Sequence, residues 1–298
     1  MNAAANNRSL AILTWRAPVT LARTLKALEP ITHLFGERLV VCQESDPEEI
    51  RLAEQAGYTA IGTEENLGIQ GGLKHAVKSA KAKRVLLLEN DCHFLGDADD
   101  FERLLDKADQ LMDVRPIRFV KMFPHTDKST RRFLKYWRLE NGRLKRRLRG
   151  HLRRTKSDLL LCAAIRVTPA KALPSHAIKP LGDSLFLTDS RYCPWSNLTN
   201  YLDRDFFLSQ IVAFAEKNPT KRTFNGKPDL EHCITSSRRR AWWGQGWWRQ
   251  QRFPILDVHP DFFGHFRLDR PENDEKRLRG AAENWMPKSE STNSADPN

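Results

Sequence analysis

The sequence predicts an α/β fold, in which a mainly parallel sheet is covered by helices on both faces. Short apolar runs alternate with amphipathic stretches through residues 1–125, and repeated strand–helix units of this kind connect parallel strands. The chain has 298 residues, of which 40% are hydrophobic and 29% charged, as in ordinary soluble globular proteins. A chain of this length can form a core without disulfide or metal staples.

Local signals place the elements of the first half. Four apolar runs are short enough for buried strands: Leu10–Thr14, Arg38–Cys42, Tyr58–Gly62 and Arg84–Leu88. Helices are expected between them: after Pro18, from Pro47 (with Asp46 as N-cap) toward Gly57, within Gly68–Lys83, and over Asp99–Met112. In parallel sheets, ligands bind at the carboxyl ends of the strands, which makes the residues directly after each strand candidates for chemistry.

The second half has a different pattern. Arg115–Phe123 and Tyr136–Arg146 are expected to form strands, the latter as a hairpin around Asn141-Gly142, and Phe206–Lys217 is expected to be helical. Leu159–Val167 is a further buried run. We expect one domain over residues 8–285, with a nucleotide-sugar half (8–125), an acceptor-side half (126–285) and a disordered polar tail (286–298).

Cysteine usage and hydropathy indicate a cytoplasmic protein. The five cysteines are far apart and contain no CxxC pair, which argues against a disulfide framework and against a cysteine zinc site. The N-terminus lacks the apolar stretch of a signal peptide. The longest apolar run, Leu159–Ile165, is far shorter than the about 20 residues of a membrane-spanning helix.

The net charge of +12 comes almost wholly from one segment. Twelve Lys and Arg residues lie between Arg131 and Lys156, opposed only by Glu140, so this segment carries 12 − 1 = +11. No helix-turn-helix, zinc-finger or RNA-binding signature accompanies it, which makes nucleic acid an unlikely partner. An anionic membrane surface (at the inner face of the membrane), an anionic acceptor and a merely solvated face are the other three interpretations.

The most informative motif is Glu89-Asn90-Asp91, directly after the apolar strand Arg84–Leu88. Two carboxylates separated by one residue at a strand end can share one Mg²⁺ or Mn²⁺ ion, which prefers oxygen ligands. The alternative is an acidic loop that only solubilises the strand end. A second motif, the glycine-containing stretch Asn66–Lys74, precedes a helix whose N-terminus can face a diphosphate, although it fits neither the dinucleotide-binding nor the P-loop pattern.

In combination these segments resemble the GT-A glycosyltransferases, most closely those of family 2. The matching segments are Leu13–Pro18, Leu39–Val41, Glu65–Gly68, Gly71–Leu73 and Leu86–Asp91. The resemblance covers about residues 8–95 and implies a UDP- or GDP-sugar donor. It assigns Mn²⁺ or Mg²⁺ to Glu89 and Asp91, with Glu89 in place of the usual first Asp. It also implies a set of donor-binding residues: Thr14, Arg16, Gln43, Glu44, Asn66, Gly68, Gly72, Lys74, Glu89 and Asn90.

Two C-terminal segments extend the resemblance. Pro228–His232 is similar to the acidic motif that supplies the catalytic base, a role for which Glu231 is preferred over Asp229; a helix-capping acid is the alternative. Phe263–Asp269 is similar to the late segment that completes the metal site, with His265 as the third ligand and His259 as its competitor. The tryptophans of Pro194–Asn197 and Trp242–Trp248 shape the acceptor side or pack in the core.

The sequence therefore predicts a metal-dependent, inverting glycosyltransferase that acts on a glycan, lipid-linked or other hydroxyl acceptor in polysaccharide biosynthesis. One alternative is a nucleotidyltransferase, although Thr14–Pro18 lacks the glycine- and basic-rich signature of that class. The other is a non-catalytic protein that binds nucleic acid or an anionic membrane through residues 131–156.

Overall fold

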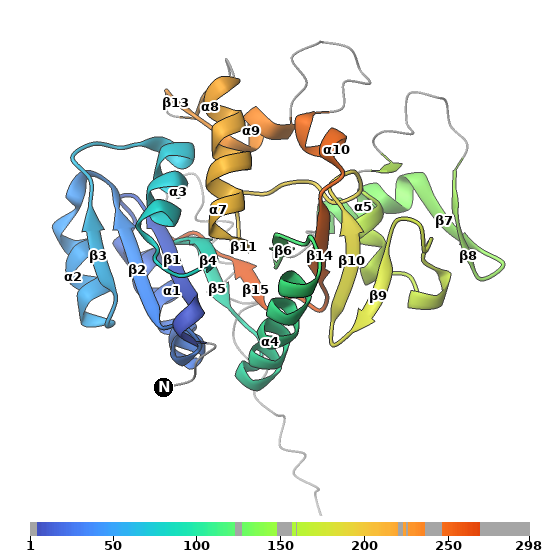
Figure 1. The fold of residues 1–298 in the computed structure, drawn as a ribbon, viewed down its shortest axis with the longest axis horizontal. Coiled ribbons are helices and arrows are strands. Elements are labelled where there is room, and N and C mark those ends of the chain that lie inside the picture. Colours follow the sequence, from blue (N-terminus) through green and yellow to red (C-terminus); the bar gives the residue numbers. More distant parts are fainter. Residues whose placement is uncertain are drawn as a thin grey trace, which may run out of the picture.

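A central sheet organises the molecule in the computed structural model (Figure 1), which describes residues 5–122, 127–147, 157–158, 160–219, 223–224, 226–235 and 246–268. Within these residues nine strands form one sheet. Their order is β3 (Thr59–Gly62), β2 (Glu37–Cys42), β1 (Arg8–Thr14), β4 (Arg84–Glu89), β11 (Asn200–Asp203), β6 (Phe119–Lys121), β14 (Pro254–Val258), β10 (Leu185–Asp189) and β9 (Lys179–Gly182).

The sheet confirms the predicted α/β class. The pairs from β3 to β4 are parallel, as expected from the strand–helix alternation, and β6 pairs in parallel with β14. Antiparallel pairs enter where β11 lies between β4 and β6 and where β10 joins β14 and β9. The sheet is therefore parallel in its N-terminal half and mixed beyond it.

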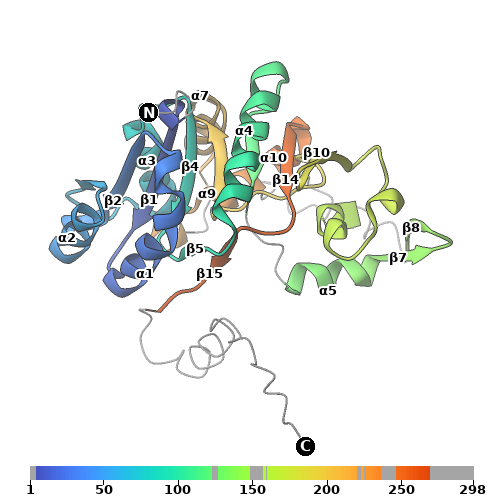
Figure 2. The ribbon, with the colours of Figure 1, turned by 90° about the horizontal axis from the view of Figure 1, so that it is seen from below.

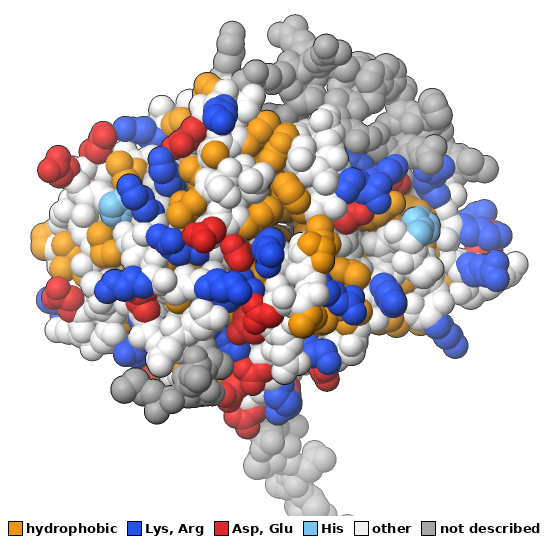
Figure 3. Space-filling view, in the orientation of Figure 1, with side chains coloured by type: hydrophobic (Ala, Val, Ile, Leu, Met, Phe, Trp, Pro, Cys, Tyr) orange, Lys and Arg blue, Asp and Glu red, His pale blue; other side chains and the backbone are white. Residues whose placement is uncertain are grey.

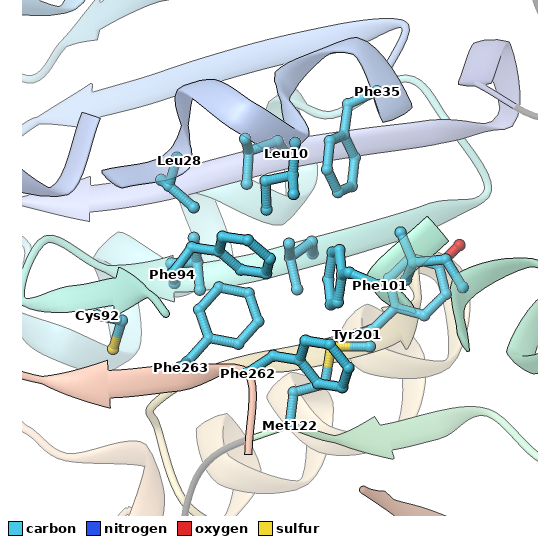
Figure 4. Close-up of a cluster of buried hydrophobic side chains, with 14 of the residues drawn as sticks. Leu10, Leu28, Phe35, Cys92, Phe94, Phe101, Met122, Tyr201, Phe262 and Phe263 are labelled. Atoms are coloured by element: carbon cyan, nitrogen blue, oxygen red, sulfur yellow. The ribbon is translucent and has the colours of Figure 1, made fainter. Parts of the chain in front are cut away.

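Helices cover both faces (Figures 1 and 2) because strand side chains alternate between two cores. Leu10 and Ile12 of β1 belong to one core, and Ala11 and Leu13 to the other. The first core also contains residues of α1 (Pro18–Leu28), α2 (Pro47–Gln55) and α4 (Ala98–Val114), with the aromatic group of Figure 4. The second core contains residues of α3 (Gly68–Ser79), α9 (Leu230–Thr235) and α10 (Trp247–Gln251). It also contains residues of one continuous helical segment, which consists of α7 (Arg204–Phe206), the π-helix Phe207–Val212 and α8 (Ala213–Lys217).

The register of the parallel strands brings their carboxyl ends level with one another. Leu13 of β1 pairs with Glu89 of β4, and Thr14 pairs with Cys42 of β2. At the opposite edge the buried guanidinium of Arg84, in the first residue of β4, forms an ion pair with Asp203 at 2.6 Å. The carboxyl edge is where the predicted motif residues gather.

The remaining elements are short. β5 (Cys92–Phe94) pairs with β15 (Phe263–His265), β12 (Thr223–Phe224) with β13 (Lys227–Pro228), and β7 (Trp137–Glu140) with β8 (Arg143–Arg146). The β7–β8 turn confirms the predicted hairpin, since Asn141 and Gly142 have φ of 50° and 70°. Within the described residues, the 3-10 helices are Ala5–Asn7, Glu29–Leu34, Gln43–Ser45, Leu161–Arg166 and Ala170–Ala172.

Several sequence predictions for the second half differ from the structure. Of the strand predicted over 115–123, the described residues 115–122 hold only the three-residue strand β6, which follows the end of α4 at Val114. The helix α5 (Asp127–Tyr136) before the hairpin was not predicted, since its apolar face is narrow: Phe133 is buried while Arg131 and Arg132 are exposed. The predicted tail 286–298 lies outside the described residues. Among the described helices, none combines the length and apolarity required to cross a membrane.

Candidate active site

The acidic motif lies where β4 ends, beside the carboxyl end of β1. Glu89 is the last residue of β4 and is half-buried, whereas Asn90 and Asp91 are buried. By the alternation of the strand, Glu89 shares a face with Val85 and Leu87, which belong to the core that holds α3 and α9. The Glu89 side chain is thus directed to the face of the sheet that α3 and α9 cover.

His265 reaches the motif from the far end of the chain. Its Nε2 lies 2.8 Å from Asp91 Oδ2, because β15 pairs antiparallel with β5 and aligns His265 with Cys92. Two further contacts hold the same loop: the Phe266 N–H donates to the Asp91 carbonyl at 2.8 Å, and Arg267 Nε lies 3.7 Å from Asp91 Oδ2. The competing His259 lies after β14 and donates its backbone N–H to the Ser184 carbonyl instead.

The charges of these side chains are strongly coupled. Burial and the neighbouring Asp91 carboxylate raise the pKa of Glu89 to about 7. Burial opposes the ionisation of Asp91, but the hydrogen bond and charge of His265 lower its pKa below the usual value. The pKa of His265 is raised in turn. Burial alone would lower it, but the hydrogen bond and charge of Asp91 outweigh burial. Two adjacent carboxylates of this kind are stabilised by positive charge between them.

The donor set fits a hard divalent cation. Glu89 and Asp91 offer carboxylate oxygens, and His265 offers an imidazole nitrogen, which together suit Mn²⁺ or Mg²⁺. Bidentate phosphate oxygens can complete such a site. Glu89, Asp91 and His265 are thus the residues near the end of β4 whose donor atoms match the chemistry of such a cation.

Thr14 and Asn90, both predicted donor contacts, are buried and hydrogen-bonded to each other. Asn90 Nδ2 donates to Thr14 Oγ1 at 2.9 Å, and the Asn90 carbonyl accepts from Thr24. Thr14 Oγ1 in turn donates to Glu49 of α2, which also accepts the Ala17 N–H at 2.8 Å. Their side chains therefore position the β1–α1 turn and the acidic motif from within the protein.

Arg16 and Glu44 form an exposed rim between the ends of β1 and β2. Arg16 Nε lies 2.7 Å from Glu44 Oε2, and the indole N–H of Trp15 donates to the same oxygen at 2.9 Å. Arg16, Glu44 and Ser45 have φ of 48°, 62° and 49°. Left-handed backbone at three non-glycine residues is strained and is typical of functional sites. This rim keeps both predicted donor-binding side chains accessible.

The remaining predicted donor residues contact or belong to α3, and two of them, Gln43 and Asn66, bind its N-terminus. Gln43 Oε1 accepts the Leu67 N–H at 2.8 Å, and Asn66 Oδ1 accepts the Gly68 N–H at 2.7 Å. A Cβ at Gly72 would lie 2.5 Å from Leu13 Cδ1, so that glycine permits close packing of α3 on β1. The predicted cation Lys74 forms an ion pair with Glu216 of α8.

Asp229, one of the two predicted catalytic carboxylates, is held in a fixed position before α9. Asn197 Nδ2 donates to Asp229 Oδ1 at 2.8 Å, and the Glu231 N–H donates to the same oxygen at 3.1 Å. Asn197 is itself oriented by the indole N–H of Trp195, at 3.0 Å. The pKa of Glu89 is raised by burial, by Asp91 and, to a smaller extent, by the charge of Asp229.

The structure adds residues that sequence reasoning missed. Glu49 contacts Thr14 and Arg267 lies beside Asp91; both are charged and partly or fully buried, and a buried charge needs a partner. Of the tryptophans, Trp195 and Trp248 are core residues, which confirms the packing interpretation for these two. Trp242 and Trp243 lie outside the described residues.

The described part of the basic segment forms an exposed surface, which we call the basic arm and define as residues 127–147, with α5, β7 and β8. Its blue side chains lie at the right of Figure 3, and Figure 2 shows α5 on the same side of the sheet as β5 and β15. The exposed cations are Arg131, Arg132, Lys135, Arg138, Arg143, Lys145, Arg146 and Arg147. Leu134 and Leu139 among them are 48% and 51% exposed. Residues 148–156 lie outside the described ones.

Comparisons with known proteins give no match to a protein-family model and no match to a curated protein. Among solved structures, glucosyl-3-phosphoglycerate synthase from Mycobacterium tuberculosis, in complex with Mn²⁺, UDP and glucosyl-3-phosphoglycerate, is 14% identical with a TM-score of 0.47. It covers 89% of this chain and 73% of its own. The S. aureus TarS fragment 1-349 is 11% identical with a TM-score of 0.44, covering 86% of this chain and 59% of its own.

A mannosyltransferase from Pyrobaculum calidifontis, in complex with GDP-Man and Mn²⁺, is 18% identical with a TM-score of 0.35. It covers 43% of this chain and 37% of its own. The function proposed for this chain rests on its own site residues.

Proposed function

We propose that this protein is a metal-dependent GT-A glycosyltransferase that moves a sugar from a nucleoside-diphosphate sugar to a hydroxyl acceptor with inversion. The observation that supports this most is the placement of Asp91. Its carboxylate lies at the end of β4 beside Glu89 and is bound by His265 at 2.8 Å. Carboxylates and an imidazole so arranged suit a metal that carries a diphosphate.

Glu89, Asp91 and His265 would hold Mn²⁺ or Mg²⁺. When bound, such a cation neutralises the negative charge that develops on the diphosphate leaving group. The Arg16–Glu44 rim and the N-terminus of α3 are the proposed binding surfaces for the nucleoside and pyrophosphate of a UDP- or GDP-sugar. Gln43, Asn66 and Gly68 position that helix N-terminus through the contacts described above.

A carboxylate must accept the proton of the acceptor hydroxyl as its oxygen attacks the anomeric carbon. The bond from that carbon to the diphosphate oxygen breaks, and its electron pair leaves with the diphosphate. We propose Asp229 for this role in place of Glu231, which the sequence resemblance preferred. The support is that Asn197 Nδ2 donates to Asp229 Oδ1 at 2.8 Å and fixes this carboxylate.

The proposal is tested by calorimetric titration of the full chain with UDP, GDP and their sugars, with and without Mn²⁺. Saturable binding of one nucleotide that requires Mn²⁺ is expected, and Asp91→Asn is expected to abolish the Mn²⁺ requirement together with tight binding. Asp99→Asn serves as the matched control, because Asp99 is exposed in the first turn of α4. Unchanged Mn²⁺-dependent binding by Asp91→Asn would refute the metal assignment.

The basic arm is proposed to bind anionic lipid headgroups, which would place a lipid-linked acceptor near the site at the inner face of the membrane. Eight exposed cations and two exposed leucines suit an interface that is both anionic and apolar. Each cation near such a surface contributes about 1 kcal/mol. The test is co-sedimentation with phosphatidylglycerol vesicles, with phosphatidylcholine vesicles as control. Equal binding to both, or binding that survives Arg143→Ser with Lys145→Ser and Arg146→Ser, would contradict it.

A further inference from the structure

A second cluster of metal-ligating side chains lies apart from the Glu89–Asp91 motif. Cys162 comes from the 3-10 helix Leu161–Arg166, Cys193 from the segment between β10 and β11, and Asp257 from β14. One ligand atom from each residue lies within 4.8 Å of the other two, and all three residues are buried. Neither thiol is in a disulfide.

The spacing of these atoms suits a small tetrahedral ion. Zn–S bonds of about 2.3 Å and Zn–O bonds of about 2.1 Å hold neighbouring ligand atoms about 3–4 Å apart. Soft sulfur donors select zinc, whereas the carboxylate and imidazole donors of the motif at β4 suit Mn²⁺ or Mg²⁺. The two clusters thus differ in the metals that they prefer.

Lys121 contributes a positive charge beside this cluster. It is buried at the end of β6 and pairs in register with Asp257 across the parallel β6–β14 ladder. Two thiolates and one carboxylate carry −3, which Zn²⁺ and the Lys121 ammonium balance to zero. Two protonated thiols beside an Asp257–Lys121 pair also sum to zero. Zinc binding therefore exchanges two thiol protons for one ion without leaving a net buried charge.

Cys162 lies at a junction between two hydrophobic clusters. Its own side chain packs in the core under α3 and α9, whereas its neighbours Leu161 and Ala163 belong to the separate cluster that contains Phe133 of the basic arm. An ion bound here would join the base of the basic arm to β14 of the central sheet. It would hold the basic arm in position and stabilise the folded protein, and it would take no part in sugar transfer.

We propose that Cys162, Cys193 and Asp257 form a structural Zn²⁺ site that fastens the basic arm to the sheet. A solvent molecule or a further side chain would supply the fourth ligand. This site could not be predicted from the spacing of the cysteines in the sequence, because its ligands come from three segments that are far apart along the chain.

The experiment uses the full chain, depleted of metal by chelation under reducing conditions and then titrated with Co²⁺ and with Zn²⁺. A thiolate-to-cobalt charge-transfer band is expected in the near ultraviolet on the wild-type protein, and one equivalent of Zn²⁺ is expected to remove it. Elemental analysis of protein purified from zinc-supplemented medium is expected to find about one zinc per chain, reflecting the tight binding of structural zinc.

Variants locate the ion. Cys193→Ser and Cys162→Ser are expected to lose the cobalt band, and Cys42→Ser is the matched control, because Cys42 is equally buried but lies in β2. Absence of the band from the wild-type protein would overturn the proposal without any variant. So would a band that both cysteine variants keep. Asp91→Asn is expected to leave the cobalt band intact, so that failure of the glycosyltransferase proposal is distinguishable from failure of this one.

Discussion

His265 Nε2 lies 2.8 Å from Asp91 Oδ2, although 174 residues separate the two along the chain. This contact joins the acidic motif at the end of β4 to the strand β15. It also makes the charge at Asp91 depend on a residue from the C-terminal half.

Replacing His265 is expected to weaken Mn²⁺ binding. His265→Ala removes both a nitrogen donor and the group that orients Asp91, and loss of such orienting contacts typically costs 10- to 100-fold in metal affinity. Calorimetry with Mn²⁺ in the presence of the preferred nucleoside diphosphate measures the change. His259→Ala is the control and is expected to bind Mn²⁺ as the wild type does. Equal affinities for all three proteins would exclude His265 as a ligand.

Mn²⁺ affinity is expected to increase as the pH rises through about 7. The pKa of Glu89 is raised to about 7 by burial and by Asp91, so below that pH a proton occupies the carboxyl and competes with the metal. The raised pKa of His265 acts in the same direction, since imidazolium cannot bind a cation. Titrations across this range test the sign. A steeper dependence in Glu89→Gln than in the wild type would contradict the role of Glu89.

Asp229→Asn is expected to lower turnover with little effect on donor binding. General-base catalysis contributes about 10²- to 10⁴-fold, and asparagine can keep the contact with Asn197 in an altered hydrogen-bond arrangement but cannot accept the hydroxyl proton. Release of nucleoside diphosphate from the donor sugar, with water as the acceptor, measures the loss. Glu231→Gln is the comparison and is expected to retain most activity. The reverse ranking would assign the base to Glu231.

Substitutions of Glu49 test the buried hydrogen bonds that it accepts from Thr14 and Ala17. Burial raises its pKa above 4.5, the usual value. A carboxyl with a raised folded-state pKa destabilises the fold progressively as the pH rises above the unfolded-state value. Glu49→Gln removes the buried charge and keeps the oxygen that accepts from Thr14 and Ala17, so its free energy of unfolding at neutral pH is expected to equal or exceed that of the wild type.

Glu49→Ala is expected to behave oppositely, because it leaves the buried Thr14 hydroxyl and Ala17 N–H without this acceptor, at a cost of about 1–3 kcal/mol each. Denaturant unfolding of the two variants in parallel separates charge burial from hydrogen bonding. A Glu49→Gln protein as unstable as Glu49→Ala would show that the negative charge itself is required.

Local sequence signals predicted the first half of the fold well. The strands from Leu10–Thr14 to Arg84–Leu88 each hold a run of apolar residues that alternate between two cores. Two helices begin at Pro18 and Pro47 as predicted, and the helix predicted over Asp99–Met112 begins one residue earlier, at Ala98. Such signals lie within one element. The strands β11 and β6 contain only four and three residues, so their pairing depends on tertiary contacts.

The residues of the candidate site could be predicted where they lie within one sequence motif. They could not be predicted where only tertiary packing brings them together. Glu89 and Asp91 follow one strand, and His265 lies in a recognisable aromatic segment. Glu49, by contrast, has the sequence context of an ordinary first-turn glutamate of α2, and only the packing of α2 on α1 brings its carboxyl to Thr14. The cysteines show the same effect, since Cys162 and Cys193 meet across segments that share no local pattern.

The pairing of β15 with β5 has a consequence for the order in which the protein matures. On the ribosome, β1 through β4 leave the exit tunnel long before His265, Phe266 and Arg267 are synthesised. A nascent chain can therefore assemble the parallel half of the sheet while Asp91 still lacks its three partners from the C-terminal half. The Asp91 carboxylate gains its contacts with His265 and Arg267 only after residue 267 has been synthesised.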